Sequence, residues 1–428
     1  LNRTSNIDYG LSYSQLNQIN VPAVHATGNY GQGVIVGSFD NGVRLLNHEA
    51  FDTLRTRLIA TYDFVDHKVS VTPNNPGEGF GAHGVATLSA MGGYKPGQLI
   101  GPAFGASFII ARTENDSSET PLEEDNWVAA IEWAESLGVD VTSTSLGYLT
   151  YDPPYSSWTW QNMDGKTTVI TRAADMAVSK GVVVVNSAGN NGFNATHNTL
   201  NAPADGDSVL SIGALTIDGE RAGFSSVGPT LSTPPRIKPD VMAQGLLVRS
   251  AHTANPTEYA YAQGTSLSCP LAAGVAALLI HANPTASAVE IMNAMRQTAS
   301  RASSPDREYG WGVINAMDAV NLVSGGQRIP TAYKLLQNYP NPFNPSTNIV
   351  FDLPKSSFVS LKIYNLLGQE VKTLATNQQF IGHPSIIWHG DTNSGSTIAT
   401  GVYFARLSAR SVDGTSNYAS TIKLVFLR

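Results

Sequence analysis

The sequence predicts a doubly wound α/β domain with a mostly parallel sheet, followed by a small all-β sandwich. Short β-branched runs alternate with helical stretches over the first three quarters of the chain. After the pair Gly325-Gly326 the composition changes, and a proline-rich segment leads into strand-like runs separated by turn residues. A length of 428 residues is also more than one ordinary domain needs.

Short apolar runs that do not alternate with polar residues predict the strands of the first domain, because a sheet covered on both faces is buried throughout. These runs are Val34–Phe39, Ser107–Ala111, Val139–Thr142 and Val182–Asn186. Helical patterns lie between them at Glu123–Ser136 and Thr168–Lys180. Gly138 and Gly181 follow these two patterns, as helix-ending glycines do.

The second domain opens at Tyr339–Pro345, which contains three prolines and cannot be helical. The strands predicted for this domain are Ile349–Leu353, Val359–Tyr364, Ile386–Trp388, Val402–Leu407 and Thr421–Phe426. We therefore place the first domain at residues 1–325, a linker at 326–330 and the sandwich at 331–428.

Composition excludes several classes of protein. Hydrophobic residues make up 42% of the chain and charged residues 14%, which is enough apolar material for a large core. The formal net charge is -7 without a basic stripe, so we expect no nucleic-acid partner. We find no apolar run of the length that a bilayer requires and expect no transmembrane segment. The single cysteine, Cys269, allows no intramolecular disulfide and is interpreted as a small buried hydrophobe.

Two segments place a reactive side chain beside a glycine-containing turn. Asp40 closes the first apolar run and is followed by an Asn-Gly turn. His83 stands after a glycine-rich turn, at the start of a small-residue helical pattern. Taken singly, Asp40 would be a turn cap. A lone histidine is more often structural, which is how we interpret His25, His48 and His67.

A third segment, Gln263–Gly274, places Ser266 at the start of a helix predicted to run through Ala272–His281. A helix N-terminus offers free N–H groups and positive potential, which suit a developing oxyanion. Pro270 is interpreted as a first-turn proline that favours helix initiation. The plain alternative for Ser266 is a serine that caps the helix.

Together the three segments resemble the subtilisin-like serine proteases, in which the aspartate, the histidine and a Gly-Thr-Ser-x-x-x-Pro signature follow in this order. The resemblance covers roughly residues 8 to 323. Ser187–Gly192 matches the family's oxyanion-hole segment, and Tyr309–Gly312 matches its closing glycine turn. The resemblance implies a secreted serine endopeptidase on a subtilisin-like α/β fold.

The resemblance also implies a role for each matching residue. Ser266 would attack the scissile carbonyl, His83 would take and return its proton, and Asp40 would orient the imidazole. The Asn190 side chain and the Ser266 backbone N–H would bind the oxyanion. An extended peptide would pair with the backbone as an added strand. The residues expected at this substrate site are Ser145, Leu146, Gly147, Ala188, Gly189, Gly264 and Thr265. Neither a metal nor another cofactor would be required.

The chain departs from the family pattern at three places. Val85 replaces a threonine two residues after the histidine, Asn41 follows Asp40 directly, and Thr142–Thr144 replaces the usual strand sequence. These changes remove no triad residue but bear on orientation. Two main functions therefore stay open: an endopeptidase of extracellular proteins, broad or with one narrow target, and a catalytically silent surface binding protein on a protease scaffold.

Two further stretches have unusual composition. Tyr148–Trp160 is rich in aromatic residues and proline, and would form either an aromatic wall of the cleft or a surface packing of rings. The acidic stretch Asp116–Asp125 lacks the ligand spacing of a calcium loop. We interpret it as a solvated face that leads into a helix, so a structural calcium ion is conceivable but not indicated.

The C-terminal part carries a second resemblance, through Leu335–Thr347, Val359–Tyr364 and Gly401–Phe404. These segments resemble the C-terminal sorting domain recognised by the type IX secretion system of certain Gram-negative bacteria. The alternative is an immunoglobulin-like module that binds carbohydrate or protein. The resemblance implies export to the surface or medium of a Gram-negative bacterium, with the secretion machinery as a partner. It would also explain why no signal peptide is seen at Leu1. We expect a monomer.

Overall fold

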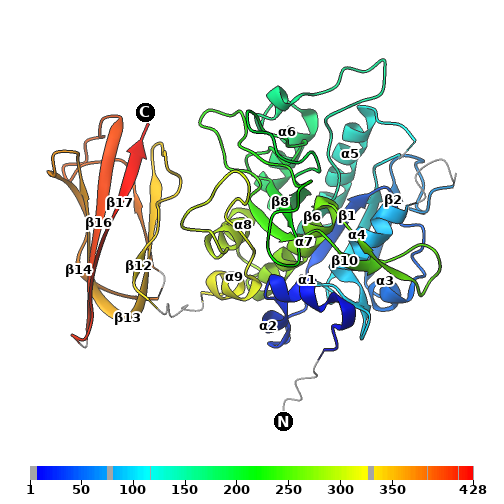
Figure 1. Cartoon of the computed structure of the whole chain (residues 1–428), viewed down its shortest axis with the longest axis horizontal. Coiled ribbons are helices and arrows are strands. Elements are labelled where there is room, and N and C mark those ends of the chain that lie inside the picture. The colour runs from blue at the N-terminus through cyan, green and yellow to red at the C-terminus, as the bar shows by residue number, and fades with distance from the viewer. Residues whose placement is uncertain are drawn as a thin grey trace, which may run out of the picture. The chain divides into compact units, whose positions relative to one another are not determined.

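The computed structural model describes residues 7–74, 81–115, 117–325, 332–382, 384–412 and 414–427. The chain divides into two compact units, Leu1–Ser324 and Gly325–Arg428, each with its own hydrophobic core (Figure 1). The predicted linker 326–330 lies outside the described residues, as do Gly79 and Phe80 ahead of His83.

A seven-stranded parallel sheet forms the centre of the first unit, in the order β2-β5-β1-β6-β7-β8-β9. Its strands are β1 Ile35–Asp40, β2 Leu58–Asp63, β5 Ser107–Arg112, β6 Val141–Thr144, β7 Val183–Ser187, β8 Leu210–Leu215 and β9 Val241–Gln244. The four predicted strands are confirmed to within two residues as β1, β5, β6 and β7. The other three strands of this sheet were not predicted.

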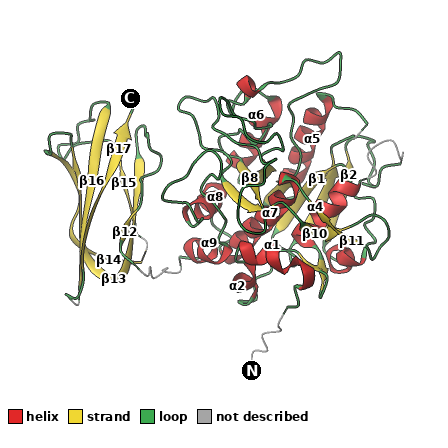
Figure 2. Cartoon of the chain, viewed as in Figure 1, coloured by secondary structure: helices red, strands yellow, loops and turns green. Residues whose placement is uncertain are grey.

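Helices cover both faces of this sheet (Figure 2). Successive side chains of a strand point to opposite faces. In β1 the Phe39 ring packs edge-on against Trp127 of α5 (Leu122–Ser136), with ring centroids 5.9 Å apart. The next side chain, Asp40, reaches His83 of α4 (Ala82–Gly92) on the other face. The sheet is therefore doubly wound, as predicted.

Apart from α7 (Thr265–Ala282) and short 3-10 helices, the other elements of the first unit are mostly short. They are α1 Tyr13–Gln18, α2 Val21–His25, α3 Asp52–Arg55, β3 Tyr94–Lys95, β4 Leu99–Ile100, α6 Val169–Ser179, β10 Val248–Ala251, β11 Tyr259–Ala262, α8 Ala288–Gln297 and α9 Ala316–Val323. Helices α5 and α6 confirm the two predicted helices. Gly138 and Gly181 follow them with φ of +81° and +102°, which only glycine adopts readily.

Helix α7, Thr265–Ala282, packs against strands β6 to β9 and against α4. It is long and apolar enough to cross a membrane, so the expectation that no run has this length is wrong. However, 83% of the helix is buried within the protein, as in the core helix of a soluble domain. Pro270 is the sixth residue of α7, so its predicted place in the first turn is also wrong.

The second unit is antiparallel. Its strands are β12 Lys334–Leu335, β13 Thr347–Tyr364, β14 Glu370–Gly382, β15 Ser385–Trp388, β16 Gly401–Ser411 and β17 Asn417–Phe426. The first part of β13 pairs with β12 and β15, and its second part pairs with β14 and β16, which in turn pairs with β17. Strand β13 thus joins two predicted strands and contributes to both layers, consistent with the predicted sandwich. Strand β14 was not predicted.

Candidate active site

The candidate residues follow the carboxyl ends of three adjacent strands. Asp40 ends β1, Ser145 follows β6, and Ala188 follows β7. These strands are neighbours in the order β1-β6-β7. Because all are parallel, their carboxyl ends meet at one edge, where open α/β sheets bind ligands.

Asp40 and His83 form the centre of this edge. Nδ1 of His83 lies 2.7 Å from Oδ1 of Asp40, which also accepts from the backbone N–H of Asn41 at 2.8 Å. Oδ2 of Asp40 accepts from the hydroxyl of Thr87, one helical turn after His83, at 2.9 Å. Asp40 is 2% exposed, whereas the His83 side chain is 37% exposed. The carboxylate is therefore held inside the protein while the imidazole reaches solvent. Thr87 was not among the site residues expected from the sequence.

Two of the residues that depart from the family pattern, Asn41 and Val85, have structural roles here. The side-chain oxygen of Asn41 accepts from the backbone N–H of Gly84 at 3.0 Å and so ties the strand end to the start of α4. A side chain on Gly84 would collide with the carbonyl oxygen of Gly42, which explains the glycine after His83. Val85 is fully buried in the core.

Ser266 is the second residue of α7, and the helix cap is Gly264, so Ser266 is not a capping serine. Its hydroxyl donates to the carbonyl oxygen of Ser145 at 3.1 Å. The hydroxyl of Ser145 donates in return to the carbonyl oxygen of Ser266 at 2.8 Å. This reciprocal pair joins the start of α7 to the segment that follows β6.

Asn190 and Ser266 present two donors to one open space. The side-chain oxygen of Asn190 accepts from the backbone N–H and the hydroxyl of Thr265, at 2.9 and 3.0 Å. This orients the amide nitrogen of Asn190. A Cβ built on Gly264 would lie 3.6 Å from that nitrogen and 3.6 Å from the backbone nitrogen of Ser266. Gly264 has φ of +137°, and its missing side chain leaves this space free.

The segment Ser145 to Gly147 is held from the side of β7. The carbonyl oxygen of Leu146 accepts from the side chains of Asn186 and Ser187, at 3.0 and 3.3 Å. The backbone N–H of Gly189 donates to the Thr265 hydroxyl at 3.3 Å, and Ala188 is fully buried. The structure thus brings every candidate residue to the same edge of the sheet, on β1, α4, the start of α7 and the loops after β6 and β7.

The aromatic stretch Tyr148–Trp160 was expected to form a wall of the cleft or to pack on the surface. Its first two tyrosines do neither. Tyr148 and Tyr151 are buried in the core, and their hydroxyls donate to Glu114 and Glu124. Trp158 also donates to Glu124, at 2.7 Å. The two tyrosine rings form neither an open wall of the cleft nor a surface packing, because they are buried and bonded to buried carboxyls.

The acidic stretch is not a solvated face throughout, because Glu123 and Glu124 are only 3% exposed. Asp116 lies outside the described residues. Carboxylate oxygens of Glu114, Glu119 and Glu123 lie within 4.8 Å of one another, a spacing that a cation could bridge. Burial raises the pKa of Glu114 well above its usual range, and the neighbouring Glu123 adds to the effect. Protonation of Glu114 would therefore also allow the three carboxyl groups to lie this close together without a cation.

Cys269 lies on α7 near the strand ends but is fully buried. Its thiol contacts the carbonyl oxygens of Thr144 and Val185, at 3.4 and 3.6 Å. Burial raises the pKa of this thiol to about 12, so it stays protonated and unreactive at neutral pH. The interpretation of Cys269 as a buried hydrophobe is confirmed.

Known proteins resemble both units. The subtilase family model matches residues 31–312, and the model of a secretion system C-terminal sorting domain matches residues 337–418. Subtilisin DY of Bacillus licheniformis is 32% identical over 297 residues, covering 69% of this chain and 94% of the relative. A subtilisin of Bacillus pumilus is 31% identical over 314 residues, covering 73% of this chain and 98% of the relative.

Solved structures agree in fold. MycP1 from Mycobacterium smegmatis has a TM-score of 0.56 at 21% identity, covering 75% of this chain and 86% of that chain. The prenylagaramide maturation protease PagA has a TM-score of 0.55 at 21% identity, covering 71% of this chain and 98% of that chain. With the family model spanning most of the first unit, this chain belongs to the subtilase family of serine endopeptidases and ends in a type IX sorting domain for export.

Proposed function

We propose that this protein is a secreted endopeptidase that cleaves extracellular proteins through an acyl-enzyme formed on Ser266. The observation that carries the proposal is the 2.7 Å contact between His83 and a buried Asp40, at the sheet edge where the Ser266 helix begins. A buried carboxylate that holds one ring nitrogen of a partly exposed histidine is what general-base catalysis requires.

The proton would move along this line of residues. With Nδ1–H donating to Asp40, the imidazole is in the tautomer whose Nε2 carries no proton and can act as the base. The Ser266 hydroxyl, which donates to Ser145 at 3.1 Å, must turn from that carbonyl toward the imidazole. Its oxygen then attacks the scissile carbonyl, and His83 passes the proton to the leaving amine. Water, activated by the same histidine, releases the acyl group and restores the serine.

The oxyanion of each tetrahedral intermediate would occupy the space beside Gly264. The amide of Asn190 and the backbone N–H of Ser266 both border this space. These donors are fixed before substrate binds, since Thr265 holds the other end of the Asn190 side chain. The substrate backbone would lie along Ser145, Leu146 and Gly147 as an added strand.

The C-terminal unit would direct export from a Gram-negative bacterium, and the peptidase would act as a monomer outside the cell. No step in this scheme needs a cofactor. Protein substrates are favoured over small esters, because a site that binds the substrate as an added strand forms hydrogen bonds with an extended peptide backbone.

Labelling with a phosphonyl fluoride, located by peptide mass spectrometry, tests the proposal together with casein hydrolysis. We expect the label on Ser266, and loss of both label and hydrolysis in Ser266→Ala. Ser268→Ala is the matched control, because its hydroxyl is buried in the same helix and donates to the carbonyl oxygen of Thr265, within that helix, at 2.9 Å. A native protein that takes no label and leaves casein intact would instead support the silent binding protein.

A further inference from the structure

The two units carry opposite charge. Residues 325–428 contain nine Lys and Arg but only four Asp and Glu, a formal charge of +5. The rest of the chain therefore carries -12, since the total is -7. Such an asymmetry between two parts of a chain points to a separate, anionic partner for the basic part.

Four of these nine cationic residues lie on one face of the second unit. Along β16 the side chains of Arg406, Ser408 and Arg410 are exposed, whereas the residues between them are buried. Lys362 of β13 lies opposite Arg406, and the exposed Lys423 of β17 lies opposite Phe404. We call the outward side of β13, β16 and β17 the basic face.

Most of the charge on the basic face is not neutralised. Lys362 is paired with Glu370 of β14, at 2.8 Å. Among the residues that the structure describes, Arg406, Arg410 and Lys423 form no ion pair. Three cations therefore remain available to a ligand.

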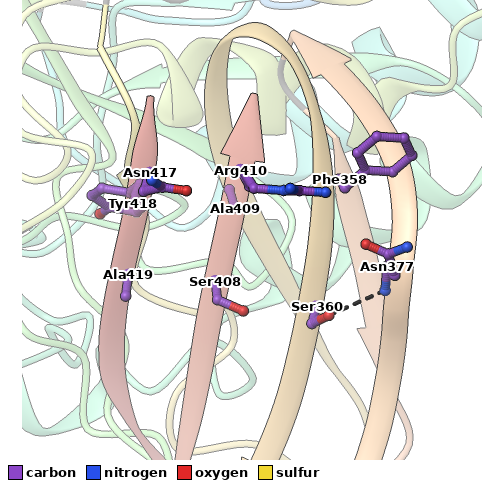
Figure 3. Close-up of a pocket in the computed structure, with 9 residues that line it drawn as sticks. All are labelled: Phe358, Ser360, Asn377, Ser408, Ala409, Arg410, Asn417, Tyr418 and Ala419. Atoms are coloured by element: carbon purple, nitrogen blue, oxygen red, sulfur yellow. Dashed lines mark hydrogen bonds between the residues drawn. The ribbon is translucent and has the colours of Figure 1, made fainter. Parts of the chain in front are cut away.

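A shallow groove of about 480 Å³ crosses this face (Figure 3). It is lined by Phe358, Ser360, Asn377, Ser408, Arg410 and Asn417, among others. Figure 3 shows the Arg410 side chain extending from β16 across the face toward Phe358 on β13. Below it, hydroxyl and amide groups from three strands lie side by side, and the Ser360 hydroxyl accepts from the backbone N–H of Asn377 at 3.1 Å.

We propose that the basic face binds an acidic polysaccharide. The guanidinium group of arginine binds carboxylate and sulfate groups with two parallel hydrogen bonds. The hydroxyls and amides of the groove both donate and accept, which suits the hydroxyl groups of sugar rings. The half-buried Phe358 supplies an apolar surface for the carbon face of a sugar ring. Arg406 and Arg410 stand four residues apart on one strand, roughly 13 Å, which favours a polymer over a single small anion.

Two other anionic partners fit less well. A membrane surface is bound by dense basic clusters or by apolar side chains that insert into it, and the face offers neither. Single-stranded nucleic acid needs a series of aromatic rings on which bases stack. Among the described groove residues only Phe358 supplies a ring on the outward side, since Tyr418 lies opposite the buried Ala409. Tyr364 and Phe404 share this side of the sheet but are not part of the groove lining. This proposal is independent of the catalytic residues, because it concerns only the second unit.

Binding of the full chain to alginate, a polyuronate, tests the proposal, with neutral dextran as the reference polymer. The Ser266→Ala background prevents self-digestion during the measurement. We expect alginate binding that weakens with salt, no dextran binding, and a loss of at least tenfold in affinity for Arg410→Glu. Lys334→Glu is the matched control, since it makes the same charge change at an exposed position on β12, and we expect less than twofold change.

Ser408→Glu is a second variant, which places a negative charge in the middle of the groove without removing an arginine. It should weaken alginate binding as strongly as Arg410→Glu, while casein hydrolysis by the otherwise native enzyme stays unchanged for both. Equal losses in Lys334→Glu and Arg410→Glu would overturn the proposal, because binding would then follow net charge. Absence of alginate binding, or binding only to anionic lipid vesicles, would overturn it as well.

Discussion

The hydroxyl of Ser145 donates to the carbonyl oxygen of Ser266 at 2.8 Å, and that carbonyl lacks the usual α-helical donor. In an α-helix it would accept from the N–H of the residue four positions later, which is Pro270 and has no N–H. Pro270 thus leaves the buried carbonyl of Ser266 without its helical donor. The hydroxyl of Ser145, 121 positions earlier in the chain, donates to it instead. Together with the bond from the Ser266 hydroxyl to the Ser145 carbonyl, this contact fixes the expected substrate-binding segment against the start of α7.

Ser145→Ala should therefore lower both stability and turnover. The buried carbonyl loses its donor, which costs about 1–3 kcal/mol of unfolding free energy. Because the same contact positions Ser266, we expect kcat to fall roughly tenfold for this loss of about 1 kcal/mol or more. Thermal unfolding and peptide hydrolysis measure the two effects, and Ser145→Thr, which keeps a hydroxyl, is the control.

The double variant Ser145→Ala/Pro270→Ala gives a sharper test. Alanine at position 270 restores an N–H that can donate to the Ser266 carbonyl within the helix. We expect the double variant to unfold at a higher temperature than Ser145→Ala alone. Additive losses from the two substitutions would show that the carbonyl is not the shared partner.

The second prediction concerns Thr87, whose hydroxyl donates to Asp40 at 2.9 Å. Thr87→Val keeps the shape of the side chain but leaves one oxygen of a buried carboxylate without this donor. We expect kcat to fall about three- to tenfold, as for the loss of one hydrogen bond of about 1 kcal/mol. Steady-state hydrolysis of a peptide substrate measures it.

Thr142→Val is the matched control for Thr87→Val. Thr142 is also fully buried, but its hydroxyl has no hydrogen-bond partner among the residues that the structure describes. Replacing it should leave kcat unchanged and leave stability equal or slightly higher. If both valine variants reduced kcat alike, the effect would come from the buried hydroxyls in general and not from contact with Asp40.

The parallel sheet was predictable because β1, β5, β6 and β7 are short, apolar and buried on both faces. Other strands lack this signal for physical reasons. Strand β8 contains Gly213, which weakens the pattern of a strand, and β9 is only four residues long. Strand β14 is largely polar, and Ala375 is the one buried residue among its described side chains, so it has neither an apolar run nor a clear alternation.

The triad candidates were identified from local patterns combined with a family resemblance, whereas the contacts that support them were not. Thr87 lies 47 residues from Asp40 in the chain, and its role depends on how α4 approaches β1. The inner rings Tyr148 and Tyr151 are rich in apolar surface and gave no sign of their carboxyl partners. Such partners become visible only when the chain is folded, because local patterns carry no information on long-range pairs.

The third prediction separates the two roles of Asn190. Asn190→Asp keeps the oxygen that accepts from Thr265 but removes the donor beside Gly264. We expect kcat to fall about 10²- to 10³-fold, the usual effect of losing one oxyanion donor, with little change in KM. The unfolding temperature should stay near that of the native chain. If Asn190→Asp and Asn190→Ala both lowered the unfolding temperature strongly and by the same amount, Asn190 would have a structural role instead.

The last prediction concerns Asp205, a fully buried residue outside the active site. Its carboxyl accepts from the backbone N–H of Gly165 and from the hydroxyl of Thr171, both at 2.8 Å. Burial outweighs these bonds and raises its pKa from 3.8 to about 6. Between about pH 4 and 6 the folded protein therefore holds a proton that the unfolded chain releases. The stability that this proton contributes is present below about pH 4 and is lost as the pH rises through 6.

Asp205→Asn removes this titration, since its amide cannot ionise. Relative to the native chain, the variant should gain unfolding free energy as the pH rises from 4 to 6, by up to about 3 kcal/mol over the interval. At pH 4 the unfolding free energy of the variant should be lower than that of the native chain. The NH2 group that replaces one carboxyl oxygen cannot accept the hydrogen bond from the backbone N–H of Gly165. Chemical unfolding at several pH values measures the difference, with the exposed Asp218→Asn as control. A parallel pH dependence of native chain and variant would mean that Asp205 stays ionised in the folded protein, held by its two donors.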